Sequence, residues 1–319
     1  MKIVIIGPGA LGSLFAAELA ARADNDVWLL DHDAERAARI NGKLLLTVGE
    51  QEFCRLVSFS ADATRIGPAD LVLLCVKSRD VAAGINGSRA LFTPTTILIT
   101  FQNGISHLDT LAQMKLPVQP AVGVTAMGAT LKAPGHVCHG GHGLTRIGFL
   151  SPVPREKEKQ LDRVEDLFRQ AGMPTERVAN ILDFVWAKLL VNVGINALTV
   201  IYDCPNGDLL VNAEAKAKLV AAVLEGHAVA RALGIDVPTD PVSQTLTVCE
   251  ATAANISSML QDVRRRRPTE IGAINGALLD KARELGIDVP VNSELVSRVR
   301  QIEDGYLRTA PRGSCPDRL

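Results

Sequence analysis

The sequence of 319 residues predicts an α/β domain followed by an all-helical domain, with the boundary between residues 178 and 179. In the first part, short apolar runs alternate with segments of helical periodicity, which is typical of βαβ units and a parallel sheet. From residue 180 onward, only helical patterns follow one another. With 47% hydrophobic residues, the chain can bury the cores of two domains.

Four apolar runs are expected to form the strands of the first domain, over residues 2–7, 26–31, 71–77 and 95–103. Helices are expected over 10–23, 33–39 and 80–85, so that both faces of the sheet are covered. Residues 118–149 are short runs punctuated by glycine, which favour a meander, and a charged helix is expected to follow over 154–170.

The second domain is expected to consist of long helices over 180–199, 212–233, 240–261, 270–285 and 292–307. Two of them end alike, in RALGIDVP and RELGIDVP. Glycine after the last turn and proline beyond it form a common helix stop signal.

Composition excludes several classes of partner. The chain has 34 basic and 35 acidic residues and only 4% aromatics, so neither charge nor stacking surfaces indicate nucleic acid binding. Six cysteines without a CxxC pair are typical of a reduced, intracellular protein. No apolar stretch is expected to reach the roughly 20 residues that a membrane span needs. A cytoplasmic location without membrane contact is therefore expected, and a homodimer remains open.

The segment KIVIIGPGALG places Gly7, Gly9 and Gly12 between the first strand and the first helix. In a dinucleotide-binding loop the first glycine permits a tight turn, the second lets a pyrophosphate approach the backbone, and the third lets helix and strand pack closely. The loop Gly7, Pro8, Gly9, Ala10, Leu11 and Gly12 thus predicts a cofactor site in a Rossmann-type domain. A glycine-rich turn without a ligand is the alternative.

Asp31 ends the second strand, nineteen residues after Gly12. A carboxylate there can accept hydrogen bonds from the adenosine ribose, which favours NAD over NADP. Alternatively, Asp31 caps the helix over 33–39. Arg36 and Arg39 are close enough in sequence to weaken the exclusion of NADP.

A lysine lies within the apolar segment FVWAKLLVNVGINALT, at position 188. At 100° per residue, Asn192, Asn196 and Thr199 fall within about 80° of Lys188, so the helix carries one narrow polar stripe. The alternative is a lysine at the edge of the core beside two hydrogen-bonded asparagines.

Such a stripe suits the reduction of a ketone. Hydride delivery builds negative charge on the oxygen, which requires a proton donor. Burial lowers the pKa of a lysine and makes it an effective general acid near neutral pH. The amides of Asn192 and Asn196 can bind polar groups of a small substrate.

Two further tracts contain residues that could take part in catalysis or metal binding. Ser257, Ser258 and Glu270 lie in NISSMLQDVRRRRPTEIGAING, although Thr269 and Glu270 also fit an ordinary helix start. The tract HVCHGGH contains three histidines and a cysteine, but strand geometry directs them apart, so no metal site is expected.

At these residues the chain resembles the ketopantoate reductase (2-dehydropantoate 2-reductase) family. The matching motifs are GPGALG, VK at 76–77, QNG at 102–104, WAKLLVNVGINALT with CPNGDL, and ISSMLQDVRRRRPTEIGAINGALL. The resemblance implies a Rossmann domain, a helical domain similar to the C-terminal domain of 6-phosphogluconate dehydrogenase, and a site in the cleft between them. It also implies reduction of the 2-oxo acid 2-dehydropantoate to (R)-pantoate in pantothenate biosynthesis.

The resemblance further implies roles for individual residues. Lys188 would be the general acid, and Glu270 would anchor the substrate hydroxyl. Lys77 and Asn103 would line the cofactor site. The substrate would be held by Asn192, Asn196, Asn206, Asn255 and Ser258.

The chain departs from the family pattern at Asp31, where many members have a basic residue and use NADPH. The cofactor is accordingly expected to be NAD or NADP, with Asp31 favouring NAD. A reductase of another branched 2-oxo acid and a non-catalytic dinucleotide sensor remain as alternative functions.

Overall fold

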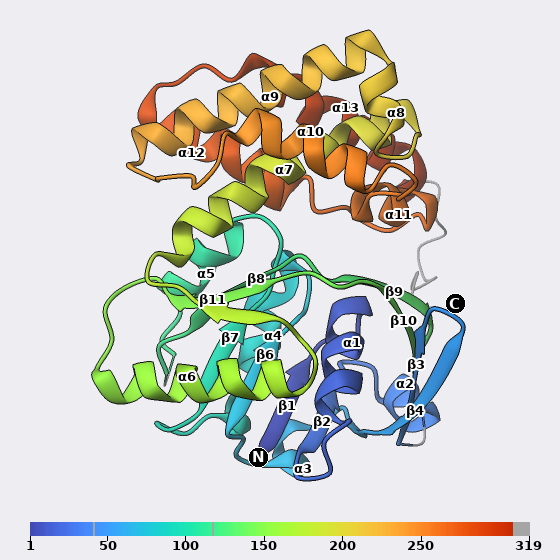
Figure 1. Cartoon of the computed structure of the whole chain (residues 1–319), viewed down its shortest axis with the longest axis vertical. Coiled ribbons are helices and arrows are strands. Elements are labelled where there is room, and N and C mark those ends of the chain that lie inside the picture. The colour runs from blue at the N-terminus through green and yellow to red at the C-terminus, as the bar shows by residue number, and fades with distance from the viewer. Residues whose placement is uncertain (41, 117, 309–319) are drawn as a thin grey trace. The chain divides into compact units, whose positions relative to one another are not determined.

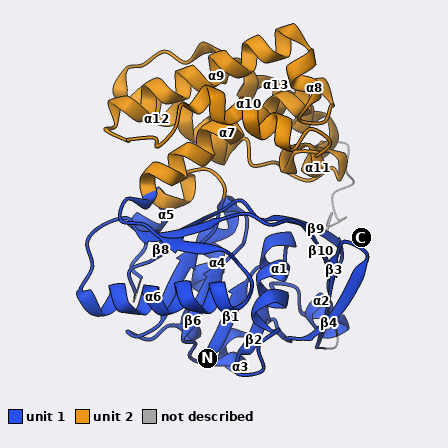
Figure 2. Cartoon of the chain, viewed as in Figure 1, with its two compact units in different colours: residues 1–102, 109–181 blue, residues 103–108, 182–319 orange. Residues whose placement is uncertain are grey.

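The computed structural model describes residues 1–40, 42–116 and 118–308, which form two compact units (Figure 2). Unit 1 comprises residues 1–102 and 109–181, and unit 2 comprises residues 103–108 and 182–319. The division after residue 181 lies close to the expected boundary at 178. The short segment 103–108 is grouped with the helices, although it follows a strand of unit 1.

The main sheet of unit 1 has eight strands in the order β12-β11-β8-β7-β6-β1-β2-β5 (Figure 1). β1 (Lys2–Ile6) lies in its middle and pairs in parallel with β2 (Asp26–Leu30) and β6 (Leu71–Leu74). The remaining strands are β5 (Ser58–Ser60), β7 (Ile97–Thr100), β8 (Ala121–Thr125), β11 (Thr145–Phe149) and β12 (Thr175–Arg177). The strand order reverses beside β1, where this type of sheet binds its ligands.

Both faces of this sheet are covered, as the alternation of strands and helices predicted. Ile3 and Ile5 of β1 pack in one apolar cluster with Phe15 and Phe168, whereas Val4 belongs to a second cluster. Successive side chains of a strand point to opposite faces, so the two clusters lie on opposite sides of the sheet. The helices of unit 1 include α1 (Ala10–Leu19), α2 (Ala34–Arg39), α3 (Ala63–Ile66), α4 (Val81–Gly87) and α6 (Arg155–Gln170), with 3-10 turns over Ser78–Asp80 and Arg89–Leu91. α5 (Ser106–Gln113) begins in the segment grouped with unit 2.

The expected meander over 118–149 is wrong. β8 and β11 join the main sheet, whereas β9 (Gly128–Ala133) and β10 (His136–Gly141) form a second sheet in the order β4-β3-β10-β9. Its other half is a hairpin that the sequence analysis did not anticipate, β3 (Lys43–Val48) and β4 (Gln51–Leu56). The apolar side chains of this sheet pack into the same cluster as α1.

Unit 2 is helical throughout its described part. Its elements are α7 (Ile181–Tyr202), α8 (Asp208–Val211), α9 (Ala213–Ala232), α10 (Pro241–Ala251), α11 (Ser258–Arg264), a π-helical turn (Gly272–Gly276), α12 (Ala277–Leu285) and α13 (Pro290–Leu307). The single helix expected over 240–261 is wrong, because Ser257 starts a new helix by accepting a hydrogen bond from the Leu260 amide. The expected stops are confirmed, with Gly234 at φ +72° and Gly286 at φ +68°.

The long helix α7 corrects one expectation. Its 22 residues, with a mean hydropathy of 1.7, are long and apolar enough to cross a membrane by length and composition. However, 67% of its apolar window is buried inside the protein, as in the central helix of a globular core. Trp186, Leu190 and Val193 fall on the side of the helix opposite Lys188 at 100° per residue, and all three are buried.

Candidate active site

The glycine loop has the geometry of a phosphate-binding turn. Gly7 has φ +100°, and a side chain there would meet Val76 at 2.9 Å. A Cβ atom on Gly12 would lie 2.1 Å from the Gly7 carbonyl oxygen, so only glycine lets α1 pack this closely. At Gly9, by contrast, a Cβ atom would meet nothing within 4 Å. This open space precedes the N-terminus of α1, whose first amides have no partner within the helix. The residues present therefore fit a pyrophosphate.

The remaining loop residues support this turn. The Pro8 carbonyl accepts a hydrogen bond from Ser13 Oγ at 3.2 Å, which ties the loop to the first turn of α1. Ala10 and Leu11 are the first two residues of α1.

Asp31 is buried at the end of β2 and is not a helix cap. Its Oδ2 accepts from Arg36 Nε at 2.6 Å, and its Oδ1 accepts from Arg36 Nη2 at 2.5 Å and from the Asp33 amide at 3.1 Å. The cap of α2 is Asp33, which accepts from the Arg36 amide at 3.0 Å. The alternative interpretation of Asp31 as the cap is therefore wrong.

A second candidate residue lies three positions after the end of the strand next to β1. Lys77 follows β6, is half-buried, and precedes the 3-10 turn over Ser78–Asp80. Gln102 holds the end of this strand, because its Nε2 donates to the carbonyls of Leu74 at 2.8 Å and Val76 at 3.1 Å. The motif QNG alone gives no sign of this supporting role of Gln102.

In unit 2, Lys188 and Glu270 are electrostatically coupled. Burial lowers the pKa of Lys188 to about 8, and the negative charge of Glu270 acts in the opposite direction and raises it. Lys188 keeps part of its accessible surface, whereas Glu270 is only 8% exposed. A carboxylate with so little contact with water keeps a strong field at the ammonium group. With a pKa of about 8, Lys188 can hold a proton at neutral pH and donate it to an acceptor.

Asn103 reaches the same carboxylate. Its Nδ2 donates to Glu270 Oε2 at 3.4 Å, and the Ile105 amide donates to the Ala273 carbonyl at 3.1 Å. Between them, Gly104 has φ +77°, and a Cβ atom there would lie 2.0 Å from the Ala273 oxygen. The segment thus fits against the π-helical turn only because residue 104 is glycine.

That π-helical turn directly follows Glu270. Asn275, fully buried within it, donates from Nδ2 to the Val193 carbonyl of α7 at 3.2 Å and to Asn292 Oδ1 at 3.0 Å. π-Helical turns are rare and occur frequently at functional sites. Asn275 therefore links the segment that contains Glu270 to α7, the helix that contains Lys188.

α7 is one continuous helix, so Asn192, Asn196 and Thr199 lie within about 80° of Lys188 around its axis. Asn192 is half-buried, Asn196 is buried, and Thr199 is fully buried. Thr199 Oγ1 donates to the Asn196 carbonyl at 2.9 Å and lies 2.6 Å from Ser257 Oγ. Ser257, rather than its neighbour Ser258, is thus the residue that the structure brings to the stripe.

The other residues expected to bind substrate lie in or beside one turn. Asn206 is buried and donates from Nδ2 to Thr252 Oγ1 at 2.9 Å, and its amide donates to the Asn255 carbonyl at 3.0 Å. The side chains of Asn255 and Ser258 are exposed. Asn206 therefore holds the turn in place, while Asn255 and Ser258 present their polar groups outward.

We expect Thr199→Val to lower the free energy of unfolding by about 1–3 kcal/mol, because the buried Ser257 hydroxyl keeps its bond from the Leu260 amide but loses the Thr199 hydroxyl. It should also raise KM more than it lowers kcat, since the segment beginning at Asn255 is expected to bind substrate. Denaturation in urea and steady-state kinetics measure both effects. The matched control is Thr245→Val, whose buried hydroxyl donates to the Pro241 carbonyl of its own helix at 2.7 Å. Equal losses of stability and an unchanged KM in the two variants would contradict this role.

The histidine tract is engaged in local contacts. His136 Nε2 lies 2.8 Å from Thr47 Oγ1, and the rings of His139 and His142 are 4.3 Å apart. Within residues 1–40, 42–116 and 118–308, no group of three or more His, Cys, Asp or Glu side chains is arranged to hold a metal ion.

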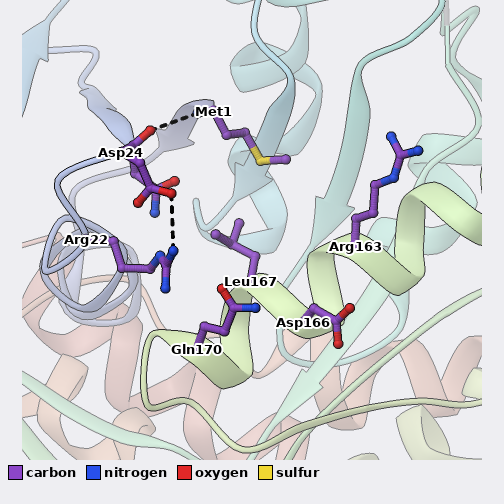
Figure 3. Close-up of a pocket in the computed structure, with 8 residues that line it drawn as sticks. Met1, Arg22, Asp24, Arg163, Asp166, Leu167 and Gln170 are labelled. Atoms are coloured by element: carbon purple, nitrogen blue, oxygen red, sulfur yellow. Dashed lines mark hydrogen bonds and ion pairs between the residues drawn. The ribbon is translucent and has the colours of Figure 1, made fainter.

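A surface pocket of about 250 Å³ lies elsewhere in unit 1 (Figure 3). It is lined at the amino end of β1 by Met1, Arg22, Asp24, Asn25, Arg163, Asp166, Leu167 and Gln170. The glycine loop follows the opposite end of the same strand. Arg22 and Asp24 bond to each other at 3.2 Å, and the Met1 amino group donates to the Asp24 carbonyl at 3.0 Å. We therefore do not assign the candidate chemistry to this pocket.

Sequence comparison connects these features with known proteins. A family model described as Ketopantoate reductase PanE/ApbA matches residues 3–152, and the model of its C-terminal part matches residues 180–303. The 2-dehydropantoate 2-reductase of Halobacterium salinarum is 36% identical over 304 residues, which cover 94% of this chain and 98% of the relative. That of Vibrio cholerae is 32% identical and covers 96% and 99%.

Solved structures confirm the predicted fold class. A ketopantoate reductase from Ralstonia eutropha superposes with a TM-score of 0.87 at 32% identity, covering 96% of this chain and 100% of that chain. The ternary structure of D-mandelate dehydrogenase with NADH and anilino(oxo)acetate also has a TM-score of 0.87, at 26% identity and with the same coverage.

Proposed function

Because the chain belongs to the ketopantoate reductase family, we propose that it reduces 2-dehydropantoate to (R)-pantoate in pantothenate biosynthesis. The observation that carries this proposal is the coupling of Lys188, with a pKa of about 8, to the buried Glu270. It supplies the proton donor that reduction of a ketone needs.

A nicotinamide dinucleotide held at the glycine loop would supply a hydride to the keto carbon. Lys188 Nζ donates a proton to the keto oxygen as negative charge develops there, and then recovers a proton from water. The products are the 2-hydroxy acid and the oxidised dinucleotide, so one hydride and one proton are consumed in each turnover. Glu270 assists by keeping Lys188 protonated at neutral pH.

We assign substrate binding to the polar groups of unit 2. Asn192 and Asn196 offer amides on the same stripe as Lys188, and Glu270 can accept a hydrogen bond from the substrate hydroxyl. Asn206, Asn255 and Ser258 belong to the turn that Ser257 links to this stripe. In unit 1, Lys77 follows the strand beside β1, where the cofactor is expected. Asn103, which donates to Glu270, is likewise assigned to the cofactor site.

The likeness to D-mandelate dehydrogenase favours a second candidate, reduction of another 2-oxo acid with a branched or aromatic side chain. The chemistry at Lys188 would be the same, and only the shape of the substrate pocket would differ. A non-catalytic dinucleotide sensor would not require a lysine with a pKa lowered to about 8.

A panel of 2-oxo acids separates these functions. We expect kcat/KM to be highest for 2-dehydropantoate when oxidation of NADH and NADPH is followed with the purified protein. A higher value for an aromatic 2-oxo acid would support the second candidate. Binding of the dinucleotide without turnover of any 2-oxo acid would support the sensor. The mass in solution of the same preparation determines whether the enzyme is the homodimer left open by the sequence.

A further inference from the structure

A chain of buried side-chain amides links the π-helical turn to three helices of unit 2. Asn275 in the turn and Asn292 in α13 are both fully buried. Asn275 Nδ2 donates to the Val193 carbonyl of α7 at 3.2 Å and to Asn292 Oδ1 at 3.0 Å. Asn292 Nδ2 in turn donates to two groups of α9, Glu225 Oε2 at 2.8 Å and the Ala222 carbonyl at 3.0 Å. The network thus runs from α9 through α13 and the turn to α7.

These contacts leave each amide one favourable orientation. The Asn275 amino group faces two oxygen atoms, so a rotated amide would place its own oxygen against them. Glu225 fixes the other end of the network. Its Oε1 accepts from the Val291 amide at 2.9 Å, and its Oε2 accepts from the Asn292 amide at 3.0 Å as well as from the Asn292 side chain. One carboxylate therefore holds both the first turn of α13 and the side chain that orients Asn275.

The remaining oxygen of Asn275 indicates what this residue contributes. Among the residues that the structure describes, Asn275 Oδ1 is a buried atom without a hydrogen-bond partner. A buried, unpaired acceptor lowers stability, and an apolar side chain at this position would avoid it. The contribution of an asparagine here is therefore its two donations, one to α7 and one to α13.

Asn275 and Val193 lie at equal distances along the chain from the two charged groups of the candidate site. Asn275 follows Glu270 by five residues, and Val193 follows Lys188 by five residues. The backbone between Glu270 and Asn275 is closed on itself, because the Glu270 carbonyl accepts from the amides three and four residues later, both at 3.0 Å. α7 is continuous over its own stretch. A hydrogen bond between two such ordered segments sets the position of the Glu270 carboxylate relative to the Lys188 ammonium group.

We propose that Asn275 is a positioning residue for the pair formed by Lys188 and Glu270. Asn292 and Glu225 hold the Asn275 amide in place, so they act on the same pair through it. This inference rests on the proposed function, in which Lys188 donates the proton. It gives α9 and α13 a part in catalysis, although neither helix supplies a group to the reaction.

Asn275→Ala tests this role because it removes both donations. The turn is then no longer bound to α7, and Glu270 should lie farther from Lys188 or in several positions. We expect kcat for ketone reduction to fall by about 10- to 100-fold, as for a small misplacement of reacting groups. The dissociation constant of the reduced dinucleotide should keep its wild-type value, because the glycine loop belongs to unit 1.

Val299→Ala is the matched control. Val299 is fully buried on α13, seven residues beyond Asn292, and its truncation leaves a cavity without removing a hydrogen bond. This variant should denature at a lower urea concentration than the wild type and keep the wild-type kcat. A general loss of stability would appear in both alanine variants, whereas a loss of positioning would appear only at Asn275.

Titration of Lys188 provides a readout that does not depend on turnover. The lysines are reductively methylated with ¹³C, which keeps their charge. The signal of Lys188 is identified in the NMR spectrum by its absence from Lys188→Met. Glu270 raises the pKa of Lys188 against the effect of burial. The signal should therefore titrate near pH 8 in the wild type and in Val299→Ala, and at a lower pH in Asn275→Ala.

Glu225→Gln tests the far end of the network. Glutamine has one acceptor oxygen in place of two, so it cannot accept from the three donors that Glu225 binds. We expect a smaller loss of kcat and a smaller shift of the Lys188 titration in the same direction. The double variant with Asn275→Ala should have the kcat of Asn275→Ala alone, because both changes act through one contact.

The outcomes are distinct. If Asn275→Ala fails to fold, Glu225→Gln carries the comparison with Val299→Ala. Wild-type kcat and wild-type titration of Lys188 in every folded variant of the network would overturn the inference and leave the network a purely structural role. Losses of kcat that multiply in the double variant would overturn the action of Glu225 through Asn275. If the wild type reduces no 2-oxo acid, the proposed function is overturned, and the titration of Lys188 alone still decides whether Asn275 positions the pair.

Discussion

Lys188→Ala is expected to lower kcat for ketone reduction by about 10²- to 10⁴-fold, the usual contribution of a general acid. The proton donor is lost, while the glycine loop in unit 1 is unchanged. The dissociation constant of the reduced dinucleotide, measured by fluorescence, should therefore stay within about twofold of the wild-type value, well below the tenfold change that 1.4 kcal/mol would produce. Steady-state kinetics with 2-dehydropantoate measure the loss.

Lys216→Ala is the control, since this lysine is exposed on α9 of the same unit and should be silent. The pH dependence gives an independent check. Lys188 is protonated below its pKa of about 8 and deprotonated above it. Reduction by the wild type should therefore fall above pH 8, and the reverse oxidation should gain from the same deprotonation. Full activity of Lys188→Ala would exclude Lys188 as the general acid.

The same pKa has a consequence for stability. The folded state releases the Lys188 proton near pH 8, whereas an unfolded lysine releases it near its ordinary value of 10.5. Between these values the unfolded state binds more protons, so this group makes stability rise with pH in that window. Below pH 8 the buried ammonium is unfavourable. An apolar replacement such as Lys188→Met should then stabilise the protein while removing its activity.

Gly104→Ala is the second substitution with a large expected effect. Its Cβ atom would lie 2.0 Å from the Ala273 oxygen, at a φ of +77° that alanine rarely adopts. The segment must move away from the π-helical turn, and the contact between Asn103 and Glu270 should be lost with it. We expect the free energy of unfolding to fall by about 2–4 kcal/mol, as for overpacking combined with backbone strain. We also expect kcat/KM to fall by about tenfold or more as Glu270 loses a charged hydrogen bond.

Gly234→Ala separates the two components of this effect. Gly234 has a similar φ of +72°, but a Cβ atom there would meet nothing within 4 Å. The control should cost only the conformational strain of about 1 kcal/mol and leave kcat/KM unchanged. If both glycine variants lose the same stability and keep full activity, the close packing of residue 104 against Ala273 does not contribute to activity. Chemical denaturation and steady-state kinetics of the two variants decide the matter.

Features that depend on local sequence were predictable. The glycine loop was found because a strand, three glycines and a helix follow one another along the chain. The stripe on α7 was found because helical periodicity alone places Asn192, Asn196 and Thr199 beside Lys188. In both cases, neighbours in space are also near neighbours in sequence.

Features that depend on distant partners were not predictable. The break in the helix expected over 240–261 is accompanied by hydrogen bonds from the Asn206 and Gly207 amides to Asn255 and Ala253. Burial of Ser257 rather than Ser258 depends on Thr199, 58 positions away. The ion pair of Arg36 with Asp31 depends on a side-chain conformation that residue spacing does not determine.

The π-helical turn after Glu270 makes unit 2 less regular than its sequence would allow. Deleting a single residue, such as Gly272, would let this stretch continue as an ordinary α-helix, which is the more common and better-packed form. The deletion would also turn Glu270 by about 100° around the helix axis and away from its present partners. Directed evolution that selects only for thermal stability would therefore tend to remove this turn. The resulting protein would be more stable but would lack the present position of Glu270. The irregular turn thus gives up one regular helical turn and sets the position of Glu270 relative to the helices that follow it.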